Sequence, residues 1–206
     1  MTRPSIRLAH LPTPLEPMDR LADALAGPSG RGPRLFVKRD DCTGLALGGN
    51  KARKLEYLCA EALAADCDVL VTGGGPQSNH VRMTTAAANR LGLDCHVALA
   101  GGPSRSAVGA ESGNLLLDRV LGTQMHFLER DDYYGIEAGI DDLAARLASD
   151  GRRPFAIPVG GASITGVAAY ADAANELLAQ LAGRPVDWVV VADGSGGTHA
   201  GLLAGL

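Results

Sequence analysis

Short runs of β-branched and other apolar residues alternate along the chain with longer stretches whose apolar residues recur every three or four positions. The short runs predict strands at residues 34–40, 68–74, 95–101, 124–129, 155–161 and 187–193. The longer stretches predict helices at 51–65, 79–92, 112–121, 136–149 and 165–182. Strands that alternate with helices are typical of an open parallel sheet covered by helices, so we expect an α/β protein.

Glycines gather where several of these predicted strands end, at 73–75, 160–161 and 194–197. In an open α/β sheet the ligand crevice lies at the carboxyl ends of the strands. A glycine there lets the backbone approach a ligand closely, because it has no side chain. These turns are therefore candidate binding loops.

Lys51 stands in the first turn of the helix predicted at 51–65, within the stretch GGNKARKLEY. Leu55, Leu58 and Ala62 follow at i+4, i+7 and i+11, so the lysine heads the stripe that this helix buries. A lysine desolvated at the positive end of a helix should have a lowered pKa, as an amine nucleophile requires. The same spacing also suits a lysine whose stem is buried and whose ammonium group reaches water.

Two loops add polar candidates to this lysine. The first, GGGPQSNHVR, places Ser78 and Asn79 at the start of a predicted helix, where either could be only an N-cap. The second, DGSGGTHAG, joins a strand to a helix and can surround a phosphate with backbone N–H groups. Its members are Gly194, Ser195, Gly196, Gly197 and Thr198. It is not a dinucleotide fingerprint, because His199 stands where a third glycine would be needed.

Together these features describe a site for pyridoxal phosphate. The lysine would hold an aldehyde, the Ser-Asn pair would contact a ring, and the glycine turn would hold a phosphate. The stretches KRDDCTGLALGGNKARKLEYL, QSNHVR, IPVGGAS and GSGGTHAGLLAGL resemble the D-cysteine desulfhydrase and 1-aminocyclopropane-1-carboxylate deaminase family. The match runs in order along nearly the whole chain. It implies the tryptophan-synthase-β-like fold (fold type II) of pyridoxal-phosphate enzymes. In that fold, residues 1–48 and 163–206 belong to a larger domain and 49–162 form a smaller one.

The resemblance also implies a role for each candidate residue. Lys51 is the Schiff-base lysine, and Lys54 helps the loop from Gly194 to Thr198 to hold the phosphate. Asn79 forms a hydrogen bond with the ring hydroxyl. Ser78 meets the substrate carboxylate or takes part in proton transfer. The residues implied in substrate binding are Asn50, Gln77, Ser78 and His80.

The histidine after Ser-Asn resembles desulfhydrases and related sulfo-lyases more than deaminases. We therefore expect a lyase that converts D-cysteine, or a similar three-carbon amino acid, to pyruvate, ammonia and sulfide. The alternatives are a 1-aminocyclopropane-1-carboxylate deaminase and an L-cysteate sulfo-lyase. A β-replacement synthase is disfavoured, because its asparagine loop usually reads Ser-Gly-Asn.

The sequence stops in GLLAGL soon after its last helix begins near Thr198, whereas the family continues further. The resemblance implies that the groups stacking on the cofactor ring lie beyond Leu206. A truncated, catalytically silent chain is therefore the alternative of a different class. In such a chain the apolar run WVVVA (188–192) would lack neighbours, and residues 49–162 would resist protease better than the rest.

Composition excludes some functions and leaves others open. The chain has 206 residues, 46% of them hydrophobic and 20% charged, with a formal net charge of −4. This balance gives no reason to expect nucleic acid or an anionic membrane as a partner. We expect a cytoplasmic enzyme for a small amino-acid substrate, and the resemblance implies a homodimer.

The four cysteines form no C-x-x-C pair and lie near no histidine at the spacing of metal ligands, so no metal site is expected. Buried free thiols are the expectation for Cys42, Cys59, Cys67 and Cys95. Asp193 directly precedes the candidate phosphate loop and would repel a phosphate unless its side chain turns away. Strand alternation favours an Asp193 side chain that points to solvent.

Overall fold

The computed structural model describes residues 3–30, 32–101, 112–129 and 133–206. Its main sheet has four parallel strands in the order β5-β4-β3-β6. In chain order these are β3 (Val69–Gly74), β4 (Asp94–Leu99), β5 (Gln124–Phe127) and β6 (Pro154–Ala156). Four of the predicted strands therefore form one parallel sheet, as expected for an α/β protein.

The five predicted helices correspond to α2, α3, α5, α6 and α7, and the sequence did not predict α1. The last helix, α8, begins next to its predicted start. Their bounds are α1 (Asp19–Leu25), α2 (Lys51–Ala64), α3 (Asn79–Leu91), α5 (Gly113–Val120), α6 (Tyr133–Ser149), α7 (Ile164–Leu181) and α8 (Gly197–Gly205).

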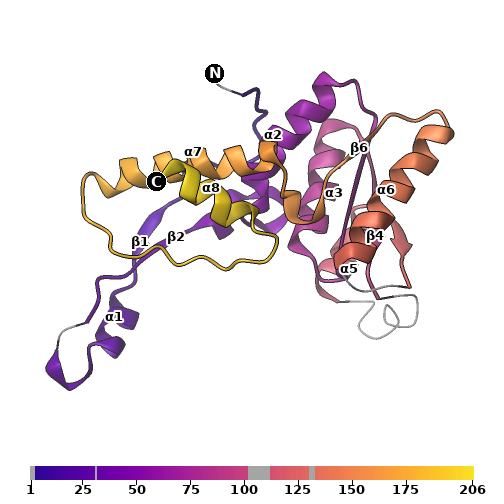
Figure 1. Ribbon diagram of the computed structural model, residues 1–206. Coiled ribbons are helices and arrows are strands. Elements are labelled where there is room, and N and C mark those ends of the chain that lie inside the picture. The colour runs from indigo at the N-terminus through magenta and orange to yellow at the C-terminus, as the bar shows by residue number, and fades with distance from the viewer. Residues whose placement is uncertain (1–2, 31, 102–111, 130–132) are drawn as a thin grey trace.

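Side-chain alternation along β3 explains why helices cover the sheet on both faces (Figure 1). Leu70 packs into an apolar cluster with residues of α2 and α3. Val69 and Val71 point to the opposite face and pack against α6. Because successive strand residues face opposite sides, a continuous apolar run is buried only if both faces are covered. All three side chains are fully buried.

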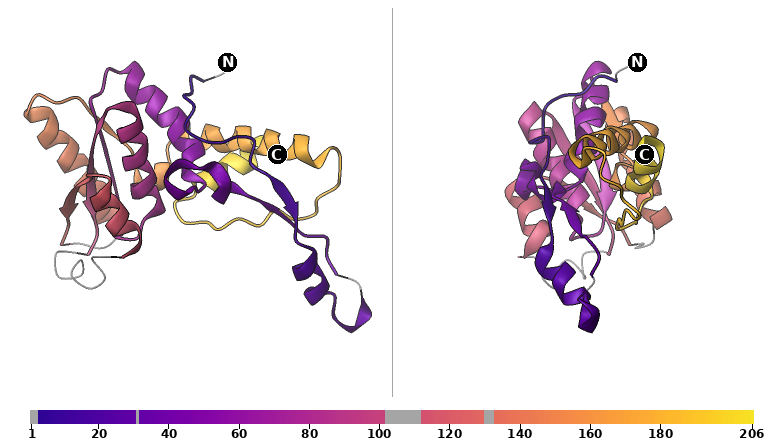
Figure 2. Two further views of the ribbon diagram at one scale, coloured as in Figure 1. Left: turned by 180° about the vertical axis from the view of Figure 1, so that it is seen from behind. Right: turned by 90° about the vertical axis from the view of Figure 1, so that its left-hand side faces the viewer.

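A second region lies beside this sheet and carries a small antiparallel pair, β1 (Leu15–Pro17) and β2 (Phe36–Lys38). The sequence predicted β2 within 34–40 but did not predict β1. The hairpin that contains α1 projects away from the main sheet (Figures 1 and 2). Helices α7 and α8 pack against each other and, in the view of Figure 1, lie above the β1–β2 pair. Helix α2 packs on both α3 and α7, so it joins the two regions.

The strand predicted at 187–193 is wrong, because the structure has no strand there. The expectation that its apolar residues lack neighbours is confirmed, since Trp188 is 87% exposed and Val190 is 94% exposed. Side chains of this segment line one wall of a pocket of about 310 Å³, whose other walls include residues of β2 and α7. An apolar run becomes a strand only where another strand can pair with it.

The cysteines are free thiols, as expected, but not all of them are buried. Cys59 and Cys95 lie in the apolar cluster between α2, α3 and the sheet. The prediction is wrong for Cys42, which is exposed, and Cys67 is only partly buried. Among the described residues, no helix is both long and apolar enough to cross a membrane.

Candidate functional site

The loop before Lys51 has an unusual backbone that the surrounding side chains hold in place. Gly48 and Gly49 have φ angles of 78° and 140°, a region that favours glycine. A Cβ atom at Gly48 would lie 1.9 Å from the carbonyl oxygen of Asp41. The buried hydroxyl of Thr43 donates to Gly49 O and accepts from Gly49 N, both at 2.9 Å. Glycine is therefore required here, because this loop lies so close to the backbone of Asp41.

Lys51 is the first residue of α2, and its side chain is half-buried. Its Nζ donates to Asn50 Oδ1 at 3.2 Å, and Asn50 Nδ2 donates to Thr198 Oγ1 at 3.2 Å. The predicted stripe below the lysine is buried, with Leu55 and Leu58 in the core. Burial lowers the pKa of Lys51, as the sequence predicted, so the amine loses its proton more easily than a lysine in water.

Lys54 lies one turn further along α2 and is only 1% exposed. Its Nζ donates to Gly160 O at 3.1 Å. Burial lowers the pKa of Lys54 to about 8, and the charge of Lys51 adds to this effect, while Asp193 opposes it. A Cβ atom at Gly197 would lie 2.8 Å from Nζ, so the start of α8 rests directly on this ammonium group.

The two glycine turns face each other beside these lysines. A Cβ atom at Gly160 would lie 2.5 Å from Ser195 Oγ and 3.7 Å from Lys51 Cε. Gly196 is the N-cap of α8 and gives its first turn no side-chain cap. The first N–H groups of a helix have no partner within the helix, so an uncapped start can bind an anion. Asp193 is exposed, as expected, and its Oδ2 lies 3.1 Å from His199 Nδ1.

The Gln-Ser-Asn stretch forms the start of α3 and contacts the start of α5. Ser78 is the N-cap of α3, and its Oγ accepts from Val81 N at 3.3 Å. Gln77 Oε1 accepts from Asn114 N at 2.8 Å, and Asn79 Oδ1 accepts from Asn114 Nδ2 at 2.8 Å. Ser78 is half-buried, whereas Gln77 and Asn79 are exposed.

His80 is buried beneath this stretch rather than at the surface. Its Nε2 lies 2.9 Å from Thr72 Oγ1, and that hydroxyl donates to Ile157 O at 2.8 Å. The hydroxyl proton is used, so His80 Nε2 must be the donor. Burial, with the charges of Lys51 and Lys54, lowers the pKa of His80 to about 3. The ring is therefore neutral, and its role in substrate binding stays a prediction.

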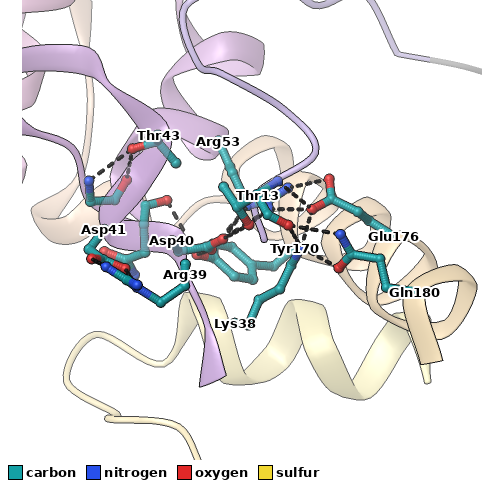
Figure 3. A network of polar contacts seen from close by, with 12 residues as sticks. Thr13, Lys38, Arg39, Asp40, Asp41, Thr43, Arg53, Tyr170, Glu176 and Gln180 are labelled. Atoms are coloured by element: carbon teal, nitrogen blue, oxygen red, sulfur yellow. Dashed lines mark hydrogen bonds and ion pairs between the residues drawn. The ribbon is translucent and has the colours of Figure 1, made fainter. Parts of the chain in front are cut away.

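A buried polar network holds α2 against α7 (Figure 3). Arg53 Nη2 donates to Asp40 Oδ1 at 2.9 Å and to Glu176 Oε1 at 2.8 Å. Tyr170 Oη donates to Asp40 Oδ2 at 2.6 Å and also lies 3.4 Å from Asn50 O. The network thus reaches the residue before Lys51 and fixes the start of α2.

Comparison with known proteins identifies the family of this chain. Residues 6–206 match the family described as pyridoxal-phosphate dependent enzyme. The chain belongs to this family. It is 46% identical over 208 residues to a D-cysteine desulfhydrase of Klebsiella pneumoniae strain 342, and 45% identical over 206 residues to that of a second Klebsiella pneumoniae strain. These alignments cover 98% of the chain and 60% of each relative, so the chain spans about 60% of their length.

Solved structures of pyridoxal-phosphate enzymes show the same fold. A structure described as an ACC deaminase homologue is 36% identical, has a TM-score of 0.87, and is matched over 99% of this chain and 59% of its own. A cysteine synthase of Entamoeba histolytica is 18% identical with a TM-score of 0.68, matched over 100% of this chain and 59% of its own, and shows the fold alone. The predicted fold class is confirmed.

The residues present fit the family's cofactor, pyridoxal phosphate. Helix α8 starts without a side-chain cap, against the buried ammonium of Lys54, where a Cβ atom at Gly197 would intrude. A phosphate group would fit this arrangement, and Lys51 stands beside it with an amine of lowered pKa. The same structure brings together Asn50 and Thr198, which are far apart in the sequence.

Three charged residues next to this site were not predicted from the sequence: Arg53, Arg82 and Asp118. Each is buried, although charged side chains are rarely buried without a partner. Arg82 stands between Val81 and Met83, both fully buried. Arg82 could have been recognised from the sequence as a charged residue at a position that helical spacing assigns to the core.

Proposed function

We propose that this chain carries the cofactor lysine and the phosphate site of a lyase that acts on D-cysteine or a similar three-carbon amino acid. In this reaction the Cα–H and Cβ–S bonds of the substrate break, one water is consumed, and pyruvate, ammonia and sulfide are released. The observation that carries the proposal is the position of Lys51, an amine of lowered pKa beside an uncapped glycine turn. The identity of 46% to a D-cysteine desulfhydrase supports the substrate class.

Each residue has a separate task in this proposal. The amine of Lys51 would hold the cofactor through its aldehyde and, when free, would take the proton from Cα of the substrate. Bound pyridoxal phosphate supplies an electron sink for the charge that develops at that carbon. Lys54 and the backbone from Gly194 to Thr198 hold the phosphate. Asn79 donates to the ring oxygen.

The remaining candidates are proposed to bind the substrate or to support the residues that do. Ser78 and Gln77 receive its carboxylate, because the start of α3 offers N–H groups and a positive dipole end to an anion. Asn50 keeps the Lys51 amine oriented, since it accepts a hydrogen bond from Nζ. His80 supports the Ser78 turn from below as a neutral ring.

We also propose the domain division of the family for this chain, with 1–48 and 163–206 in one domain and 49–162 in the other. Support comes from the main sheet, which lies wholly within 49–162, and from α7 and α8, which pack on each other outside it. The cofactor would lie between the two domains, near the contact of Asn50 with Thr198. A homodimer and a cytoplasmic location stay predictions.

The chain offers an unusually direct test, because it contains only three lysines, Lys38, Lys51 and Lys54. Borohydride reduction in the presence of pyridoxal phosphate, followed by peptide mass mapping, should place the pyridoxyl group on Lys51. Lys38 is engaged by Thr13 O, Glu176 and Gln180, so it should stay unlabelled. Lys51→Ala is the matched control and should lose the label. A label on Lys38 or Lys54 in the unchanged chain would contradict the proposal.

The role of Ser78 can be separated from its role as a helix cap. Ser78→Ala should reduce turnover of D-cysteine far more than cofactor binding, because the hydroxyl is proposed to act on the substrate. Loss of the cap alone costs about 1 kcal/mol of stability and leaves the rate per folded molecule unchanged. Ser163→Ala removes an equivalent cap from α7 and is the control. Equal effects of the two changes on turnover would contradict a substrate role.

The second candidate is a 1-aminocyclopropane-1-carboxylate deaminase, which the 36% identity to an ACC deaminase homologue supports. That substrate has no proton on Cα, so Lys51 could not begin by removing one. Supplying each amino acid separately distinguishes the candidates. Release of sulfide with ammonia from D-cysteine supports the desulfhydrase, whereas release of ammonia from the cyclopropane substrate alone supports the deaminase.

A further inference from the structure

Arg82 lies buried in α3, although a guanidinium keeps its charge at any ordinary pH. Burying such a charge is costly unless it is hydrogen-bonded, so its partners show what it does. Nη1 donates to Asn79 Oδ1 at 3.0 Å and to Asn114 Oδ1 at 2.7 Å. Nη2 donates to Gly48 O at 2.8 Å. One side chain therefore ties the start of α3, the start of α5 and the loop before Lys51.

These contacts decide which way the amide of Asn79 faces. A guanidinium can only donate, so the Asn79 atom next to Arg82 must be the oxygen. Asn114 Nδ2 donates to the same oxygen at 2.8 Å. With both donors on one side, the NH₂ group of Asn79 is the end presented to a ligand, and the residue is exposed. An isolated asparagine has no such preference between its two ends.

The loop before Lys51 also rests closely on this part of α3. A Cβ atom at Gly49 would lie 2.9 Å from Met83 Sδ and 3.9 Å from Arg82 Nη2. The bond from Arg82 to Gly48 O therefore sets the spacing between this loop and α3. Lys51 follows the loop directly, and Asn79 begins the helix.

Asp118 on α5 supplies a counter-charge to this arginine when its carboxyl group is ionised. Its side chain is 0% exposed, and its charge and that of Arg82 act on each other. Among the described residues, neither Asp118 oxygen nor Arg82 Nε has a hydrogen-bond partner. Asp118 thus acts on the guanidinium through charge, while the hydrogen bonds of the guanidinium go to the asparagines and to Gly48.

We propose that Arg82 is a positioning residue of the cofactor site: it fixes the Asn79 amide with its NH₂ group toward the cofactor ring oxygen and holds the Lys51 loop at a set distance. This inference rests on the proposed function, because it assumes that the cofactor binds between Lys51 and Asn79. Arg82 itself touches neither the cofactor nor the substrate.

A double-mutant cycle tests this role. Pyridoxal phosphate is titrated into the unchanged chain, Arg82→Lys, Asn79→Ala and the double variant, and binding is followed by absorbance. Arg82→Lys keeps the charge but loses the planar fork, so affinity should fall by roughly tenfold, as for the loss of one ordinary hydrogen bond. In the Asn79→Ala background, the loss of affinity for pyridoxal phosphate caused by Arg82→Lys should be smaller by a factor of at least roughly three. Arg90→Lys, on the same helix but bonded to Leu8 O, is the control and should change neither value.

A spectroscopic reading separates positioning from stability. A donor on the ring oxygen favours its ionised form, so loss of the donor raises the pH at which the visible band of bound cofactor appears. Arg82→Lys and Asn79→Ala should shift this midpoint in the same direction, and Arg90→Lys should not shift it. If Arg82→Lys does not fold, Asn114→Ala replaces it in the cycle, because it removes the other donor to Asn79 Oδ1.

The outcomes are distinguishable. If the unchanged chain takes up no cofactor on Lys51, the proposed function fails and the inference fails with it. If Lys51 is labelled but Arg82→Lys behaves like Arg90→Lys, only the inference is overturned. Additive effects of Arg82→Lys and Asn79→Ala on affinity, with no shift of the midpoint, would also overturn it.

Discussion

Two segments of this chain have nearly the same sequence pattern and opposite structures. DVLVTGG (68–74) and DWVVVAD (187–193) each place a run of apolar, mostly β-branched residues after an aspartate. The first forms β3, paired with β4 and β6, and its apolar side chains are fully buried. The second forms no strand, and Val190 is 94% exposed.

The contrast between β3 and residues 187–193 shows that β-propensity describes a residue's fit to a pleated surface, which other strands must provide. In β3 the neighbouring strands satisfy the backbone N–H and C=O groups on both edges, and helices cover both faces. Nothing comparable surrounds 187–193 in the described chain. Three measurements can test this contrast between the two segments.

The same substitution in the two segments should have very different costs. Val71→Ala removes two buried methyl groups and leaves a small cavity, so it should lower the free energy of unfolding by about 2 kcal/mol. Val190→Ala, the matched control, should change it by less than about 0.5 kcal/mol. Urea unfolding followed by far-UV circular dichroism measures both. Equal costs would show that 187–193 is packed in solution.

The well-packed region also contains a buried acid whose ionisation opposes folding. Burial raises the pKa of Asp118 to about 7, against the nearby charge of Arg82, whereas in the unfolded chain it is near 3.8. The folded state therefore holds a proton that the unfolded chain releases, and stability falls as the pH rises from about 4 through about 7. The pKa of the Cys95 thiol is raised mainly by burial, and the charge of Asp118 adds to this effect.

Asp118→Asn removes this dependence, because an amide does not ionise. At about pH 8 the melting temperature of the variant should be a few degrees above that of the unchanged chain, since each kcal/mol corresponds to roughly 2–4 °C. At about pH 5 the difference between the two melting temperatures should be smaller. The same change at Asp187, which is exposed in the second segment, should leave the melting temperature unaltered at both pH values. A gap that widens toward low pH would contradict the assignment.

The smallest effect concerns Trp188, the only tryptophan of the chain, which is 87% exposed. Its fluorescence should be that of an indole in water before and after unfolding. Urea should therefore hardly move the emission maximum while the circular dichroism of the sheet is lost. Trp188→Phe identifies the signal. A maximum that shifts to longer wavelength on unfolding would show that the segment is covered, and the contrast between the two regions would disappear.

Much of the fold could be predicted from local patterns. The helix that starts at Lys51 and the cap at Ser78 follow from residue types and spacing within a few positions. β1 was missed because LEP has no strand pattern of its own, and its pairing with β2 lies some twenty residues away. The strand predicted at 187–193 failed for the converse reason, since its pattern is strong but no strand pairs with it.

The candidate site divides in the same way. Lys51, Lys54, Asn79 and the loop from Gly194 to Thr198 were predicted from spacing and resemblance. Arg82 and Asp118 were not, because a charged residue in a helix usually lies in water, and only the packing of α5 on α3 buries both. The burial of His80 likewise depends on Thr72 and Ile157, which reach it from neighbouring segments.

Local sequence patterns were enough to predict the α/β class, the starts of the main helices, and the lysine and glycine turns of the candidate site. These features depend on periodicity, capping and backbone freedom, which act within a few residues. Long-range packing sets which apolar run becomes a strand, which way the Asn79 amide faces, and how far the pKa values of Lys51 and His80 fall. Those outcomes depend on hydrogen-bond partners and charges that the fold brings together from distant parts of the chain, and no local pattern records them.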